Sequence, residues 1–448
     1  MGELLVLGGG FAGLASALLA ASRGHQVTLF EAETCGGKSA QIEVAGQRID
    51  TGPAVWSFPA VWNEVFLQAG LSEWADVPHH KLDSLGTHHG KRVLDLLPTP
   101  ADAGWQRYAE RASRLTDTIE KLLYTPPRIL NPEFQRLSAR LFAELGHHLT
   151  ARSYLQSLNL PPQLEESLAV YALNTGAAPE EASALHALVP YAMLQDLRVP
   201  VGGIHELVLR LRAACLHLGV KILEHTPILK VQKNRIDTTA GAFLGTVVST
   251  LDFERLRVLM GEAVQKPARL SCSGVVLYAV LKEELDLPFH SVLLPESTTQ
   301  LAQDMQNLRQ SASPMVFVNH YRPHHIYPRN TLPVLTVGLT APPDAQLYDL
   351  DHPWLKAQLN RVENVLQVSL QDKIQDVALL DPWQLSRWGA WGGAIYGKLN
   401  PWYRSGPFHF PGYRYRGIWL AGTGVHPGGG IPATLGGALI LHQLMNHI

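Results

Sequence analysis

The amino-terminal stretch Glu3-Leu-Leu-Val-Leu-Gly-Gly-Gly-Phe-Ala-Gly13 decides the fold, because an apolar run leads directly into a G-x-G-x-x-G pattern. A stretch of small and apolar residues typical of a buried helix follows, and Gly24 ends it. A second apolar run begins at Val27 and ends at Glu31. Strand, glycine turn, helix and strand in this order predict a βαβ unit that binds the ADP half of a dinucleotide.

Each of these residue types has a physical reason. Gly8 permits the tight turn, Gly10 lets the backbone approach a pyrophosphate because it lacks a Cβ, and Gly13 lets the helix pack closely on the sheet. The helix N-terminus offers free N–H groups to the phosphates. Glu31 stands where a carboxylate can bind both ribose hydroxyls, and it disfavours NADP because it would repel a 2′-phosphate. The alternative is a buried glycine-rich turn of another α/β fold.

Length and composition limit the classes of protein to which the chain can belong. The chain has 448 residues, 46% hydrophobic and 17% charged, with a net charge of −2. This length favours two domains, and the small net charge gives no indication of a nucleic-acid partner. Cys35, Cys215 and Cys272 are odd in number and far apart, so we expect no disulfide framework, no metal site and a reducing, cytoplasmic location. No apolar run approaches the roughly 18 residues of a membrane-spanning helix.

Two further glycine segments follow the first unit. Gly36-Gly-Lys38 comes directly after the acid, and Asp50-Thr-Gly-Pro53 comes after a predicted hairpin. In this order, with the first glycine motif and Glu31, they resemble the two-dinucleotide-domain flavoproteins. That superfamily includes amine oxidases, protoporphyrinogen oxidases and carotenoid desaturases. The cofactor that the resemblance implies is FAD.

The carboxyl-terminal segment Ala421–Ala438 resembles that of bacterial phytoene desaturases, and it reads as glycine loop and helix after a short strand. A Pro-x-Gly-Gly segment at Pro200–Gly203 resembles the return from the substrate domain to the flavin domain in the same proteins. The resemblance thus covers the whole chain. The cofactor-binding residues that it implies are Gly8, Gly10, Phe11, Ala12, Gly13, Glu31, Gly37, Lys38, Asp50, Gly52, Pro53, Gly422, Thr423, Gly430, Ile431 and Pro432.

The acid/base residue is the least determined part of the site. His426 is the candidate catalytic residue, because it lies in the closing glycine loop and histidine titrates near neutrality. A role in the architecture of that loop is the alternative. Asp50 is expected to order its own turn beside the cofactor.

The fold class that follows is α/β, with a Rossmann-type FAD-binding domain interleaved with an α+β substrate domain. We expect residues 1–75, 196–262 and 385–448 to form the FAD domain. Residues 76–195 and 263–384 are then the substrate domain, which faces the membrane. Hydrophobic periodicity predicts that 60–160 is mainly helical, with helices over 103–123 and 132–149. β-Branched and aromatic runs between 271 and 337 predict the strands of a mixed sheet.

The predicted helix at 132–149 carries an apolar stripe with arginines at its edges. Phe134, Leu137 and Phe142 lie on one side, and Arg136 and Arg140 flank them. Such a helix can rest on a membrane surface, so we expect peripheral membrane contact. An ordinary helix packed on its own domain is the alternative.

The resemblance implies a carotenoid desaturase that removes a hydride and a proton from a polyene and adds a conjugated C=C bond. The substrate is then phytoene or a later carotenoid, and oxygen or a quinone takes the electrons. Three alternatives stay open: a redox-neutral carotene cis–trans isomerase, an amine oxidase-like flavoenzyme, and a lipid carrier without catalytic activity.

Overall fold

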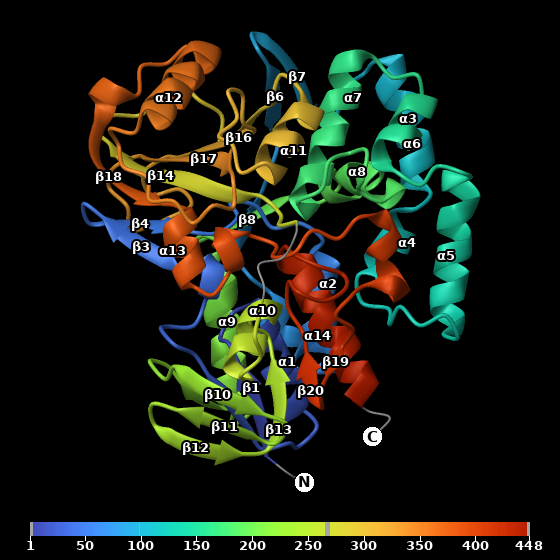
Figure 1. The fold of residues 1–448 in the computed structure, drawn as a ribbon. Helices are drawn as coiled ribbons and strands as arrows, with labels where there is room; N and C mark the ends of the chain where they lie inside the picture. Colours follow the sequence, from blue (N-terminus) through green and yellow to red (C-terminus); the bar gives the residue numbers. More distant parts are fainter. Residues whose placement is uncertain (1–2, 98, 265–268, 446–448) are drawn as a thin grey trace.

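The computed structural model describes residues 3–97, 99–264 and 269–445. A six-stranded sheet with the order β19-β20-β13-β1-β2-β9 forms the lower part of the molecule in Figure 1. Five of the strands are parallel, and β19 pairs antiparallel with β20. The strands are β1 (Leu4–Leu7), β2 (Val27–Phe30), β9 (Lys221–Leu223), β13 (Thr246–Ser249), β19 (Arg414–Tyr415) and β20 (Ile418–Leu420).

Three helices pack together beside this sheet. They are α1 (Phe11–Ala21), α9 (His205–His217) and α14 (Ile431–Met445). Every residue of β1 is buried, as expected for a parallel strand that is covered on both faces. The strands and helices of this part come from three separate stretches of the chain, so the α/β, Rossmann-type prediction is confirmed. The domain boundaries given above remain our proposal.

A second, seven-stranded sheet with the order β18-β14-β17-β16-β15-β6-β7 forms the upper part. Only β15 and β6 are parallel neighbours, so this is a mixed sheet. Helix α12 (Pro353–Leu366) covers its outer face, where Leu277, Val337 and Val318 share one hydrophobic cluster with it. The strands are β6 (Leu85–His89), β7 (Arg92–Leu97), β14 (Ser273–Leu281), β15 (His290–Leu293), β16 (Val316–Tyr321), β17 (Val334–Ala341) and β18 (Ile374–Leu380).

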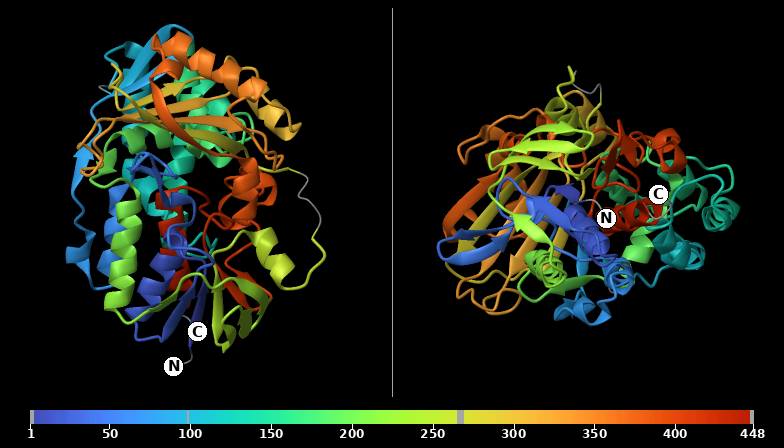
Figure 2. Two further views of the ribbon diagram at one scale, coloured as in Figure 1. Left: turned by 90° about the vertical axis from the view of Figure 1, so that its left-hand side faces the viewer. Right: turned by 90° about the horizontal axis from the view of Figure 1, so that it is seen from below.

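Most of the remaining helices gather beside the second sheet, and Figure 2 shows the two sheets as separate layers. These helices are α3 (Ala103–Ser113), α4 (Thr116–Leu122), α5 (Pro132–Leu145), α6 (Ala151–Ser157), α7 (Pro162–Ala169), α8 (Val189–Leu194), α11 (Thr298–Gln306) and α13 (Pro382–Arg387). The helices α2 (Pro59–Gln68) and α10 (Phe253–Leu259) lie nearer the lower part. Small sheets pair β3 (Gln41–Val44) with β4 (Gln47–Asp50), β5 (His79–Lys81) with β8 (Arg198–Pro200), and β10 (Ile228–Gln232), β11 (Arg235–Thr238) and β12 (Gly241–Leu244) with one another.

The prediction that residues 60–160 are mainly helical is wrong for 79–97, which form β5, β6 and β7. The cause is non-local, because β6 pairs with β15 and β5 with β8, both far along the chain. The helix predicted over 103–123 is two helices, which are separated by a turn at Arg114 and Leu115. The helix predicted over 132–149 ends at Leu145 because Gly146, with a φ of 57°, terminates it.

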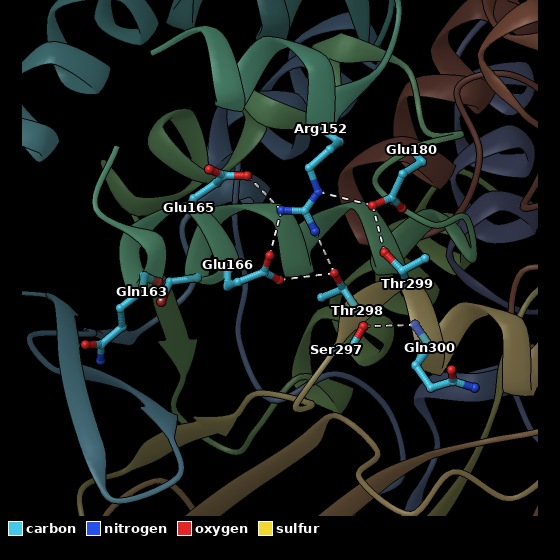
Figure 3. Close-up of polar contacts among 10 residues, drawn as sticks. Arg152, Gln163, Glu165, Glu166, Glu180, Ser297, Thr298, Thr299 and Gln300 are labelled. Atoms are coloured by element: carbon cyan, nitrogen blue, oxygen red, sulfur yellow. Dashed lines mark hydrogen bonds and ion pairs between the residues drawn. The ribbon is translucent and has the colours of Figure 1, made fainter. Parts of the chain in front are cut away.

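One largely buried cation ties α6 to α7 and α11. Arg152, in α6, contacts Glu165 and Glu166 through Nη1 at 2.9 and 2.6 Å, and Glu180 through Nε at 3.2 Å. Its Nη2 donates to the hydroxyl of Thr298, the first residue of α11, at 2.8 Å. Figure 3 shows the guanidinium between these partners. Four segments of the chain thus depend on a single positive charge.

We expect Arg152→Ala to lower the free energy of unfolding by roughly 2–3 kcal/mol, because three carboxylates would face one another without a counter-charge. Urea unfolding followed by tryptophan fluorescence measures this loss. Arg136→Ala is the control, since Arg136 is exposed and pairs with Glu133 within one helix. It should leave the free energy of unfolding close to that of the wild type. Equal losses in the two variants would contradict the role given to Arg152.

Candidate functional site

The loops after β1, β13 and β20 meet at one edge of the parallel sheet. The amide of Thr250, after β13, donates to the Leu7 carbonyl at 2.9 Å, and the amide of Ala421, after β20, donates to Ser249 at 3.0 Å. The Gly36 amide donates to the Gly9 carbonyl at 2.9 Å and brings the second glycine segment onto the first. In open α/β sheets this carboxyl edge is where ligands bind.

The first glycine loop has the shape that a pyrophosphate requires. A Cβ on Gly13 would lie 1.8 Å from the Gly8 carbonyl oxygen, so only glycine lets α1 pack this closely. A Cβ on Gly10 would meet no atom within 4 Å, so it would point into open space above the loop. No side chain caps the start of α1, where Phe11 and Ala12 are buried, and the first N–H groups therefore stay available to an anion.

Glu31 holds its carboxylate over this loop. Its Oε2 accepts from the Gly9 amide at 2.7 Å, and its Oε1 accepts from the Glu33 amide at 3.0 Å. Both bonds fix the direction of a carboxylate that stands at the end of β2. The acid and the glycine loop thus form one unit, as the prediction of a ribose-binding acid requires.

The Gly36–Lys38 and Asp50–Pro53 segments pack against each other below that loop. A Cβ on Gly37 would lie 3.6 Å from Gly10 Cα, and a Cβ on Gly52 would lie 2.9 Å from the Lys38 carbonyl oxygen. The Lys38 ammonium donates to the carbonyl of Ile395, and burial lowers the pKa of Lys38. Pro53 is exposed at the end of the turn.

The Asp50 carboxylate is buried and organises the start of α9. It accepts from Gln41 Nε2 at 2.9 Å and from the His205 amide at 3.3 Å. Burial raises the pKa of Asp50 to about 6, and the Gln41 and His205 hydrogen bonds oppose the rise. The Asp50 amide donates to the Tyr327 hydroxyl at 3.2 Å. Sequence reasoning missed Gln41, His205 and Tyr327, because all three become neighbours of Asp50 only through the fold.

The closing glycine loop leads into α14, which packs on α1. Gly422 is buried next to Thr250, Thr423 is half-buried beside it, and a Cβ on Gly429 would lie 2.1 Å from the Tyr396 ring. Gly430 is exposed just before Ile431 and Pro432, which form the first turn of the helix. The two helices whose N-termini follow the glycine loops are therefore neighbours.

His426 lies in the middle of this closing loop. Its carbonyl oxygen accepts a hydrogen bond from the Tyr413 hydroxyl. Its Nε2 is buried, with no hydrogen-bond partner in the described part of the chain. Burial, with a smaller effect from His409, lowers the pKa of His426 to about 3. The ring is therefore neutral at pH 7, with one nitrogen protonated and the other able to accept a proton.

Three features together define a dinucleotide-binding flavoprotein. They are a glycine loop open to a pyrophosphate, an acid fixed above that loop, and a second glycine loop at the same edge of the sheet. The chain belongs to the family of flavin containing amine oxidoreductases, which it matches over residues 11–434. It is an FAD-dependent oxidoreductase. No group of three or more potential metal ligands occurs among residues 3–97, 99–264 and 269–445.

Similar proteins of known activity indicate which members of this family the chain resembles. The chain is 27% identical over 495 residues to a hydroxyneurosporene desaturase of Rubrivivax gelatinosus, covering 100% of this chain and 94% of that one. It is 24% identical over 496 residues to a phytoene dehydrogenase of Streptomyces griseus, covering 97% and 93%. A redesigned putrescine oxidase has the same fold, with a TM-score of 0.64, 13% identity and coverage of 100% and 98%. The relatives are thus carotenoid desaturases, as the sequence motifs predicted.

We expect Gly10→Val to abolish FAD binding without unfolding the protein, because its side chain would fill only the space open to the pyrophosphate. The flavin absorbance of the purified variant and its melting temperature in the apo form measure the two effects. Gly13→Ala is the matched comparison, since its Cβ would strike backbone and should destabilise the apo form as well. A Gly10→Val protein with full flavin content would contradict the assignment.

Proposed function

We propose that this enzyme is a carotenoid desaturase: it removes two hydrogens from a polyene and leaves one more conjugated C=C bond. The observation that supports this most is similarity to carotenoid desaturases over nearly the whole chain. The substrate class is phytoene or a later carotenoid, and oxygen or a quinone reoxidises the flavin. Two C–H bonds break: the electron pair of one leaves with the hydride, and the pair of the other becomes the new π bond as the proton departs.

The bound FAD supplies the acceptor for the hydride. Gly8, Gly10, Gly13 and Glu31 would hold its ADP half, and the other cofactor-binding residues predicted above would surround the remainder. The chain must then position a substrate that has few polar groups. Apolar residues in one cross-strand row of the second sheet, Val276, Phe317 and Val292, offer such a surface on the face turned away from α12.

His426 is our candidate for the proton acceptor. Loss of a hydride from a polyene leaves a carbocation, whose neighbouring C–H is a strong acid, so even a weak base suffices. A buried imidazole with an unpartnered Nε2 is such a base and stays neutral at physiological pH. The alternative, that His426 only shapes the closing loop, predicts that a phenylalanine there preserves the rate of polyene oxidation.

The test is an anaerobic titration of the FAD-loaded enzyme with liposomes that contain phytoene, lycopene or 1-hydroxylycopene. We expect at least one polyene to bleach the flavin absorbance while its own band moves to longer wavelength. An oxidised flavin with all three would contradict the proposal. Conversion that needs pre-reduced FAD and yields no oxidised product would indicate the isomerase, and bleaching by simple amines would indicate an amine oxidase.

Peripheral membrane contact is the second part of the proposal, since a polyene has to leave a lipid phase. Among the described residues, no helix is both long and apolar enough to cross a bilayer. Most of the α5 stripe packs on the protein, as the alternative predicted, because Leu137 and Leu145 are buried and Phe134 is half-buried. Phe142 is exposed, and Leu130, in the loop before α5, is 88% exposed. Further aromatic residues are exposed at Tyr403 and Phe408. Such side chains insert readily into the interface of a lipid bilayer.

We expect Leu130→Glu to reduce flotation of the enzyme with phosphatidylglycerol-containing liposomes several-fold, because a charge replaces an exposed apolar side chain at the membrane surface. Leu347→Glu is the control, since Leu347 is 66% exposed in the loop between β17 and α12, and Figure 1 shows α12 on the opposite side of the molecule from α5. Equal flotation of both variants and the wild type would remove Leu130 from the membrane contact.

A further inference from the structure

Four polar residues form one row across the second sheet. His290 of β15 is paired with Asn319 of β16, Asn319 with Thr336 of β17, and Thr336 with Tyr278 of β14. Directly paired residues of an antiparallel sheet point to the same face, so the four side chains stand in a line. All four are buried. The Tyr278 hydroxyl donates to the carbonyl of Thr51 at 2.9 Å, which places that end of the row beside the Asp50–Pro53 turn.

The hydrogen bonds along the row have a fixed direction. The Asn319 amide nitrogen donates to the Thr336 hydroxyl at 2.8 Å, so its amide oxygen faces His290. That oxygen lies 2.5 Å from His290 Nδ1 and can only accept, so Nδ1 carries the proton. Burial lowers the pKa of His290, and the ring is neutral. Its Nε2 is therefore a lone-pair acceptor, and no donor to it occurs among the described residues.

A second unpartnered polar group lies next to His290 on the same face. Thr87 of β6 is paired with Val292 of β15, two residues along the strand from His290. Thr87 is 2% exposed, and its hydroxyl has no hydrogen-bond partner in the part of the chain that the structure describes. Diagonal neighbours in a sheet are separated by about 7–8 Å at Cα. His290 and Thr87 are thus diagonal neighbours on one face of two adjacent strands.

The opposite face of three of these strands is apolar. There, Leu277, Val337 and Val318 are in register and pack under α12, and the row ends at a buried serine, Ser291, on β15. Burying a polar group without a partner costs stability, so a sheet selected only for packing would be apolar on both faces. A pure hydrocarbon would leave both His290 Nε2 and the Thr87 hydroxyl unpaired. A ligand hydroxyl, which donates one hydrogen bond and accepts another, would pair both.

We infer that His290 and Thr87 select a polyene that carries a hydroxyl group, by accepting from that hydroxyl at Nε2 and donating to it from Thr87. This inference rests on the proposed desaturase function and specifies its substrate. The pair lies on β15 and β6, about 14 Å or more along the sheet from β14, whose Tyr278 touches the cofactor-binding turn. A hydroxyl held at one end would thereby fix which C–C bond lies against the flavin.

The test compares 1-hydroxylycopene with lycopene in anaerobic flavin reduction and in transfer from liposomes to the protein. We expect the wild-type enzyme to favour the hydroxylated polyene about 10- to 100-fold, the effect of leaving a buried polar group such as the Thr87 hydroxyl unpaired. His290→Phe keeps a ring beside Phe317 but removes the acceptor, and Thr87→Val keeps the shape but removes the hydroxyl. Each should reduce the preference at least several-fold while lycopene is bound and oxidised as before.

Thr118→Val is the matched control, because Thr118 in α4 is also a buried threonine whose hydroxyl has no partner in the described structure. It should leave the preference unchanged. His290→Gln, which retains an acceptor, should recover part of the preference and shows that the loss is not a folding defect. Flavin content and melting temperature of each variant are recorded alongside.

Two results would overturn the inference: equal use of both polyenes by the wild type, or an undiminished preference in both His290→Phe and Thr87→Val. Oxidation of lycopene with no preference would leave the desaturase function intact and make the row structural. If no polyene reduces the flavin, the proposed function fails, and the liposome transfer alone decides whether the pair binds a hydroxyl.

Discussion

The close approach of α1 to the loop after β1 is the constraint on which the site depends. A single methyl group on Gly13 would overlap the Gly8 carbonyl, so the helix can start where it does only with glycine there. Its free N–H groups then face the edge at which the loops after β13 and β20 also arrive. The fixed carboxylate of Glu31 follows from the same geometry, since it hydrogen bonds to Gly9 within the loop.

The second sheet is joined to this edge through buried polar contacts. The Asp50 amide reaches Tyr327, and the Thr51 carbonyl accepts from Tyr278. Gly203, just before α9, has no room for a side chain because Asp50 and the Tyr327 ring lie within 3 Å of where its Cβ would be. The cofactor turn, the helix after it and the sheet are thus packed as one unit. A substitution in the sheet is therefore expected to affect the cofactor-binding turn.

Sequence reasoning succeeded where the signal is local. Glycine motifs predicted the first βαβ unit and the hairpin before Asp50. Runs of β-branched residues predicted the strands at Ser273–Leu281 and Val334–Ala341. Sequence reasoning failed where the partner is distant. The residues at 79–97 form strands because β15 and β8 pair with them, and the partners of Arg152 come from three other segments of the chain. The polar row from His290 to Tyr278 depends on strand register, which a single sequence does not reveal.

The most direct test of the account is competition for the FAD site of the apoprotein by ADP and by 2′-phospho-ADP. The glycine loop leaves room for the pyrophosphate, and the Glu31 carboxylate repels a phosphate on the ribose. We predict that ADP displaces FAD and that 2′-phospho-ADP does so at least about tenfold less well, a difference of about 1.4 kcal/mol. Equal competition by the two nucleotides, or none by ADP, would contradict the placement of the cofactor at this edge.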